Sequence, residues 1–171
     1  MKNVFYACLV LLALSCSSDS SADQTAMDLV TGVTFRQNFE DLPLTLGNPN
    51  VRVNDQFVLY PNPAHQVILL QAQAPISAVW IVPAQAEKIY QSVDFSAVLS
   101  ATTYSEATLT SHATLSLSEQ SNNTVTMNIA SLSEGYYRVF VKIGGELYWD
   151  NLYVNPIVTE EHIAEIIGFW D

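Results

Sequence analysis

Apolar and polar residues alternate along most of the chain after Phe57, and this period of two predicts β-strands. The expected strands are short, rich in β-branched and aromatic residues, and separated by turn residues. They cover residues 67–70, 79–82, 109–117, 125–129, 136–143 and 152–154. No long helical pattern lies between them, so the spacing predicts an all-β chain folded as an antiparallel β-sandwich of two sheets.

The clearest alternation lies in residues 136–143, where one face is apolar throughout. Tyr137, Val139, Val141 and Ile143 form this face, which we expect to point toward the core. Gly144 and Gly145 follow, and glycine readily adopts the positive φ angles of a tight hairpin. The chain should therefore turn here and return as a strand through residues 147–149.

The first 15 residues have the pattern of a signal peptide helix. Lys2 precedes an apolar run at residues 4–14, which is too short to span a bilayer as a stable helix. The run ends in Leu-Ala-Leu-Ser before Cys16, which resembles a bacterial lipobox. That resemblance implies cleavage before Cys16 and attachment of the chain to a membrane by lipid on its sulfur. The alternative is an ordinary secretory peptide that contains a cysteine.

Removing the first 15 of the 171 residues leaves 156 and changes the net charge from −11 to −12, because Lys2 is lost. Cys8 is lost too, so no unmodified cysteine remains for a disulfide or a thiol reaction. Lysine and arginine total only 6 in the whole chain, which argues against a nucleic-acid partner. The 49% of hydrophobic residues predicts a folded core, which excludes a disordered acidic chain.

Three further segments flank the expected sandwich. Residues 16–27 are small, polar and acidic, and predict a flexible tether. Residues 28–57 suggest an added strand and a long connection. Residues 155–171 predict a short amphipathic helix, with Thr159 as its N-cap and with Ile163, Ile166, Ile167 and Trp170 on one face. This helix either covers its own domain, which we favour, or docks on a partner protein.

Two short motifs mark the ends of the sandwich region. Tyr60-Pro61-Asn62-Pro63 precedes its first strand, and Leu132, Gly135 and Tyr137 form an L-x-x-G-x-Y pattern near its end. With these motifs, residues 58–154 resemble the C-terminal (Por-type) sorting domain of type IX secretion substrates in Bacteroidota. The resemblance implies an immunoglobulin-like β-sandwich, and it implies a role in export or attachment at the cell surface. The chain differs in its lipid anchor and in the residues that follow position 154.

Both motifs also have a structural explanation. Pro61 and Pro63 fix φ, and they push Tyr60 and Asn62 toward extended geometry before a strand. Gly135 permits a turn, and Tyr137 is placed as in a tyrosine corner, with its ring in the core and its hydroxyl bonded to backbone. We therefore expect Asn62, Gly135 and Tyr137 to stabilise the fold rather than to bind a ligand.

Candidate chemistry is sparse. The three histidines, His65, His112 and His162, are far apart and lack zinc-ligand spacing, so we expect no metal site and no cofactor. No nucleophile motif or phosphate-binding loop is present in the sequence, so no catalytic residue is assigned and an enzyme is the minority hypothesis. Trp80 and Trp149 are candidates for stacking against a carbohydrate, although core packing is the favoured explanation for most aromatic residues in a sandwich.

These observations favour a lipid-anchored, noncatalytic β-sandwich lipoprotein of the cell envelope, with a protein partner, acting in interaction or assembly. One alternative is a type IX sorting domain that directs export or surface attachment. Another is a carbohydrate-binding surface lipoprotein. An outer-membrane location is expected, and either face of that membrane fits the sequence.

Overall fold

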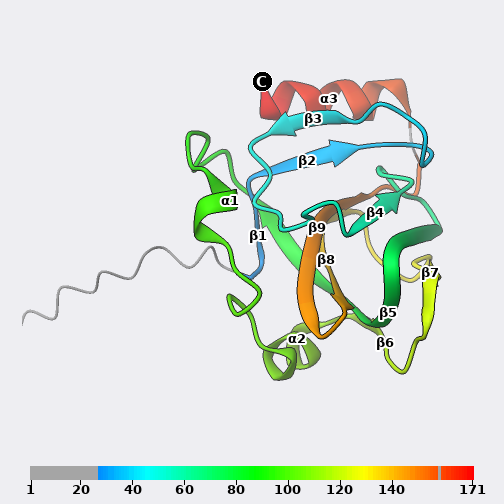
Figure 1. Ribbon diagram of the computed structural model, residues 1–171. Coiled ribbons are helices and arrows are strands. Elements are labelled where there is room, and N and C mark those ends of the chain that lie inside the picture. Colours follow the sequence, from blue (N-terminus) through cyan, green and yellow to red (C-terminus); the bar gives the residue numbers. More distant parts are fainter. Residues whose placement is uncertain (1–26, 158) are drawn as a thin grey trace, which may run out of the picture.

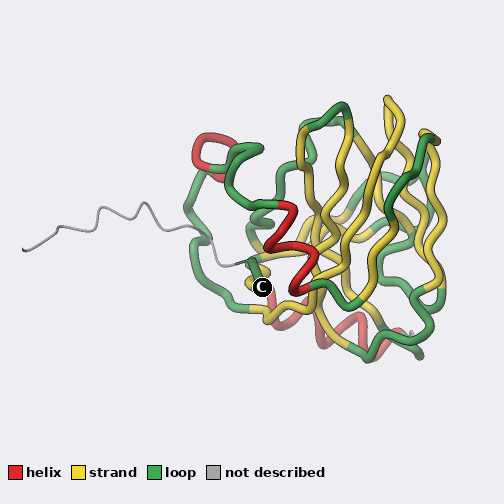
Figure 2. Tube along the Cα trace, turned by 90° about the horizontal axis from the view of Figure 1, so that it is seen from below, coloured by secondary structure: helices red, strands yellow, loops and turns green. Residues whose placement is uncertain are grey.

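A computed structural model describes residues 27–157 and 159–171 of the chain. The predicted signal peptide, Cys16 and the tether up to residue 26 lie outside the described residues. Within the described part, no helix is long and apolar enough to cross a membrane. Strands form the body of the molecule and the helices lie outside them (Figures 1 and 2).

Strands outnumber helices along the described chain. The strands are β1 (Leu29–Val30), β2 (Gly32–Phe35), β3 (Leu44–Gly47), β4 (Phe57–Tyr60), β5 (Val67–Ala86), β6 (Leu115–Leu117), β7 (Asn122–Asn128), β8 (Gly135–Ile143) and β9 (Glu146–Val154). The helices are α1 (Phe95–Val98), α2 (Glu106–His112) and α3 (Glu160–Trp170). Two of the helices lie between β5 and β6, and the third follows the last strand.

The long strand β5 organises both layers of the sandwich. Its first half pairs with β4 and β7, and its second half pairs with β8, β6 and β1. The sequence predicted two strands here, at residues 67–70 and 79–82, and this was wrong because the strand continues through Pro75. Register shifts around Ile76 mark the place where β5 leaves one layer for the other.

The shift at Ile76 also changes which side chains of β5 face the core. Ile68 and Leu70 point into it before the shift, whereas Val79 and Ile81 point into it afterwards. An extra residue in one strand reverses the side-chain alternation beyond it, so both halves present apolar residues to the same core. That core joins β4, β5, β7, β8 and β9, and the prediction of a sandwich-like β fold is confirmed.

The β8–β9 hairpin agrees with the sequence. Gly144 and Gly145 have φ angles of 59° and 88°, as the tight turn requires. All nine residues of β8 pair with β9, from Gly135 opposite Val154 to Ile143 opposite Glu146. The predicted inner face of β8 lies in the main core, and the opposite face carries buried residues as well.

The prediction of a strand over residues 109–117 was wrong in its first part. Residues 106–112 form α2. Ser105 is the N-cap of this helix, and its Oγ accepts a hydrogen bond from the Thr108 N–H at 3.2 Å. Leu109 is fully buried against the outer face of the sheet that contains β8 and β9. One buried leucine on a short, capped helix leaves too few apolar positions to reveal a helical period.

The segment before β4 contributes more structure than the sequence suggested. The expected added strand is divided into β1, which pairs in parallel with the end of β5, and β2. The expected long connection contains β3, which pairs with β2 as a separate two-stranded sheet. Figure 1 shows this small sheet between α3 and the sandwich.

The C-terminal helix covers its own domain, as favoured from the sequence. Thr159 caps α3 by accepting a hydrogen bond from the His162 N–H at 3.3 Å. Ile166 and Trp170 are buried in a second core with residues of β2, β3 and β9. A Cβ at Gly47 of β3 would lie 2.6 Å from Cε3 of Trp170, so this close contact requires glycine.

Candidate functional site

Asn62, the asparagine of the Tyr-Pro-Asn-Pro motif, is fully buried, and both the nitrogen and the oxygen of its side-chain amide are hydrogen-bonded. Its Nδ2 donates to the carbonyls of Thr34 and Asn151, at 2.8 and 2.9 Å. Its Oδ1 accepts from the Tyr153 N–H at 3.0 Å. Asn62 therefore joins β2 to β9, and its polar atoms are engaged within the fold.

The neighbours of Asn62 in the motif hold the same segment in place. The Tyr60 hydroxyl donates to Gln71 Oε1 at 3.1 Å, and Pro63 is buried. Both X-Pro peptide bonds, before Pro61 and Pro63, are cis. These contacts are all internal to the sandwich.

The second motif forms the expected tyrosine corner. The Tyr137 ring is buried in the main core, and its hydroxyl donates to the Ser133 carbonyl at 2.9 Å. Leu132 is buried beside it, and Gly135 has a φ of 144°. Tyr137 pairs with Leu152 of β9, so both motifs meet on the stretch of β9 from Asn151 to Tyr153.

The two tryptophans proposed for sugar stacking are buried. Trp80 is 6% exposed and its Nε1 donates to Thr110 Oγ1, while Trp149 is fully buried and its Nε1 donates to the Asn50 carbonyl. They pack with Phe140 and with Leu109 of α2 in a third buried cluster, on the face of the sheet opposite the main core. Neither ring offers a face to a carbohydrate, because α2 and the segment before it cover that side of the sheet.

The same covered face holds Arg138, a buried charge that the sequence did not single out. Its Nη2 donates to the Asn50 carbonyl at 2.6 Å and its Nη1 to the Tyr104 hydroxyl at 2.8 Å. The guanidinium lies over the rings of Tyr104, Phe140 and Trp149, at 5.3 to 5.7 Å. Burial lowers the pKa of Arg138 from its ordinary value. This arrangement is a structural anchor between β8 and the segment around Asn50.

The three histidines considered as candidates lie apart from one another in the described residues. His65 and His112 are exposed and His162 is half-buried, on three separate parts of the surface. Across the described residues, no group of three or more histidine, cysteine, aspartate or glutamate side chains is placed to hold a metal ion.

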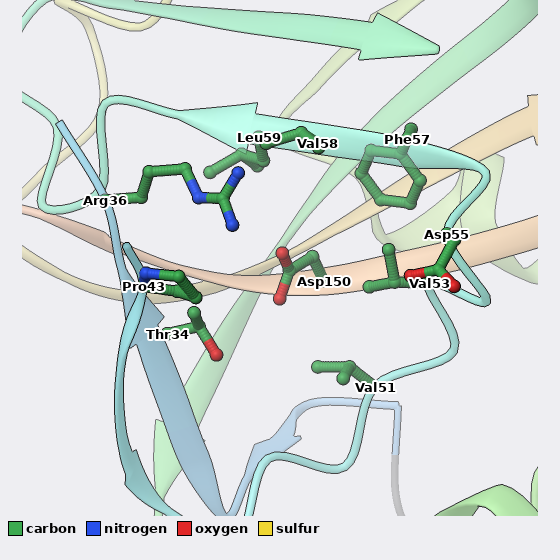
Figure 3. Close-up of a pocket in the computed structure, with 10 residues that line it drawn as sticks. All are labelled: Thr34, Arg36, Pro43, Val51, Val53, Asp55, Phe57, Val58, Leu59 and Asp150. Carbon is green, nitrogen blue, oxygen red and sulfur yellow. The ribbon is translucent and has the colours of Figure 1, made fainter. Parts of the chain in front are cut away.

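A pocket of about 250 Å³ opens between β9, β4 and the end of β2. Its walls are mainly apolar, and the apolar lining includes Val51, Val53, Phe57 and Leu59. Arg36 and Asp150 point toward each other across it (Figure 3). They come from segments more than a hundred positions apart. The Arg36–Asn62 backbone bridge and the hydrogen bonds from Asn62 to β9 bring these segments together.

Asp150 is the unusual residue of this pocket. It is half-buried, and the loss of hydration raises the pKa of its carboxyl to about 6, although its bond from the backbone of Asn151 and the charge of Arg36 act in the opposite direction. The sequence carried a signal for it. Tyr148, Leu152 and Val154 occupy the inner face of β9, and Asp150 lies among them at the same parity.

Exposed apolar side chains gather beside this pocket, where β2 turns into β3. Leu42 is 95% exposed, and Phe39 and Leu44 are 40% and 49% exposed. We call these three residues the apolar tip. The loop that carries them is ordered, because Asp41 Oδ2 accepts from the N–H groups of Gln37 and Asn38, and Arg36 Nη1 donates to the Phe39 carbonyl.

No protein-family model, no curated protein and no solved structure matches this chain.

Proposed function

We propose that this chain is a lipid-anchored, noncatalytic β-sandwich of the cell envelope that acts as a protein-interaction or assembly module. The observation that carries the interaction role is the apolar tip. Large apolar side chains held in water on an ordered loop lower solubility, and on a stable domain they mark a contact surface. A partner that covered Leu42 and Phe39 would recover the hydrophobic free energy that the isolated domain forgoes.

The anchor complements this surface. Lipid on Cys16 would hold the domain at the membrane, and the tether would give it reach. The high negative charge favours a partner with a positive surface, because complementary charge speeds association.

The immunoglobulin-like class of the sandwich is part of the same proposal. The tyrosine corner at Tyr137 supports it, as does the long strand β5 that contributes to both layers. Asn62 and Tyr137 use their polar atoms inside the fold, so the two motifs favour a shared fold and add nothing in favour of an export role.

A photocrosslinking experiment in cells tests the interaction role. A crosslinking amino acid replaces Leu42 in the full chain, and a second version carries it at Val98, which is 57% exposed on α1 away from the tip. We expect discrete adducts of defined mass from position 42 and none from position 98. Equal, diffuse labelling from both positions would contradict the proposal.

The matched variant is Phe39→Ser combined with Leu42→Ser. Both side chains are exposed, so the variant should unfold at the same temperature as the parent within a few degrees. Crosslinking from an unchanged position on the same loop, Gln37, should then fall severalfold, because the apolar contact that holds the partner is gone.

A further inference from the structure

The pocket beside the apolar tip has the wall chemistry of a small-molecule site. On the inner face of β9, Tyr148, Leu152 and Val154 pack in the main core. Asp150 occupies the intervening position of that face and lines the pocket instead. The sandwich therefore leaves open, between β9 and β4, a space that a well-packed core would fill.

Three charged residues, Arg36, Asp55 and Asp150, line the pocket, and Arg36 and Asp150 face each other without forming an ion pair. Among the described residues, no salt bridge within 4.0 Å joins Arg36 to Asp150. Arg36 Nη1 donates to the Phe39 carbonyl at 3.1 Å, and the guanidinium as a whole is directed toward Asp150 (Figure 3). The Asp150 carboxylate accepts a bond from the Asn151 N–H at 2.8 Å, which leaves acceptor positions toward the pocket.

A ligand held between Arg36 and Asp150 must satisfy both of these charges at once, whereas Asp55, the third charged residue of the lining, is exposed. A simple anion on Arg36 would be repelled by Asp150, and a simple cation on Asp150 would be repelled by Arg36. A zwitterion places each of its charges on the opposite one. The apolar wall formed by Val51, Val53 and Phe57 then requires a hydrophobic group on the same ligand.

We propose that this pocket binds a free α-amino acid with an apolar side chain. The guanidinium of Arg36 holds the α-carboxylate, and the carboxylate of Asp150 holds the α-ammonium. The apolar side chain lies against Val51 and Val53. A volume of about 250 Å³ lies below the usual range for drug-sized ligands and suits a molecule of this size.

The desolvation of Asp150 supports this assignment. Its carboxyl has lost hydration, which the raised pKa reflects, and an ammonium group in hydrogen-bond contact would restore favourable interactions to the charged form. This ligand site is independent of the protein-interaction role proposed above.

Isothermal titration calorimetry with L-leucine tests the site on the full chain purified in detergent. N-acetyl-leucine lacks the ammonium group and leucine amide lacks the carboxylate. We expect saturable binding of L-leucine and at least about tenfold weaker binding of both analogues, because each loses one charged contact. No binding of L-leucine up to about 10 mM would overturn the proposal. Equal affinity for the three compounds would overturn it too.

Two variants locate the binding. Arg36→Gln and Asp150→Asn should each weaken L-leucine at least about tenfold, while Arg52→Gln and Glu87→Gln, which lie outside the pocket lining, should leave it unchanged. Circular dichroism of each variant confirms that it is folded. Unaltered affinity in a folded Arg36→Gln or Asp150→Asn protein would place the ligand elsewhere and contradict the assignment. Crosslinking from position 42 does not depend on L-leucine binding, so a negative result for one proposal leaves the other intact.

Discussion

Three buried asparagines, Asn50, Asn62 and Asn151, connect the small β2–β3 sheet and its neighbouring strands to the sandwich. Asn151 Nδ2 donates to the Gly32 carbonyl at 2.9 Å and to Asn50 Oδ1 at 3.0 Å. Asn50 Nδ2 in turn donates to the Leu29 carbonyl at 2.9 Å. The amides of Asn50 and Asn62 suit this position because each accepts from a backbone N–H through its oxygen and donates to a backbone carbonyl through its nitrogen.

Replacing Asn62 should therefore be costly. Asn62→Ala leaves the Tyr153 N–H and the carbonyls of Thr34 and Asn151 without their buried partner. We expect the free energy of unfolding, measured by urea denaturation, to fall by about 3 kcal/mol. Asn123→Ala is the control, because Asn123 is exposed and donates a single bond to the Gln73 carbonyl. A loss below about 0.5 kcal/mol for Asn62→Ala would contradict this role.

Asp150 predicts a pH dependence of stability. Its pKa is about 6 in the folded chain and near 3.8 when unfolded, so between these values the folded state holds a proton that the unfolded state has lost. Stability contributed by this group is therefore present below about pH 4 and decreases as the pH rises to about 6.

The substitution Asp150→Asn removes this titration and retains an oxygen that can accept from the Asn151 N–H. At pH 7 the variant should be more stable than the parent by about 1–2 kcal/mol, and near pH 4 the two should converge. Urea denaturation at both pH values measures the difference. A variant that is less stable at pH 7 would show that the ionised carboxylate stabilises the fold. The expected gain in stability with a loss of L-leucine binding is typical of a binding residue.

At the scale of elements, α3 covers the second core, and weakening its contact with that core should destabilise the fold. Trp170 is buried between β2, β3 and Tyr136, and its Nε1 donates to the Tyr136 hydroxyl at 3.1 Å. Trp170→Ala should reduce the free energy of unfolding by about 3–5 kcal/mol and expose the apolar side of the small sheet to a hydrophobic dye. Phe169→Ala, at the neighbouring position that is 45% exposed, should cost less than about 1 kcal/mol. Equal effects of the two substitutions would mean that α3 does not seal this core.

Elements with a strong local signal could be predicted from the sequence, and elements set by distant contacts could not. The Gly144-Gly145 turn, the Thr159 cap and the Tyr137 corner each depend on residues close in the chain, and each prediction is confirmed. The continuity of β5 through Pro75 depends on strands β7 and β8, which pair on either side of the register shift. Pairing with distant strands overrides the local preference of proline for a break.

The same contrast between local signals and contacts of distant segments applies to the candidate pocket. Asp150 could have been found as the polar position on an apolar strand face, but nothing local links it to Arg36. Their meeting depends on the bridge between Arg36 and Asn62 and on the bonds from Asn62 to β9. Trp80 and Trp149 failed as ligand residues for a similar reason, because α2 covers them and α2 was not predicted.

At the scale of the whole molecule, the chain combines a β-sandwich and an acidic net charge with Cys16, which we propose carries lipid. The full chain has a net charge of −11, and the two ion pairs among the described residues, Arg52–Glu146 and Lys142–Glu106, lie toward the surface. Exposed pairs of this kind contribute little stability, so the packed cores and the buried polar bonds hold the fold together.

The proposed lipid anchor on Cys16 is central to the proposed function, and mass spectrometry of the N-terminus of the mature protein tests it. We expect a chain that begins at Cys16 and carries acyl groups there, and we expect a Cys16→Ala protein to lack them. A mature chain that begins at another residue, or one that begins at Cys16 without lipid, would contradict the proposal of a membrane-anchored interaction module.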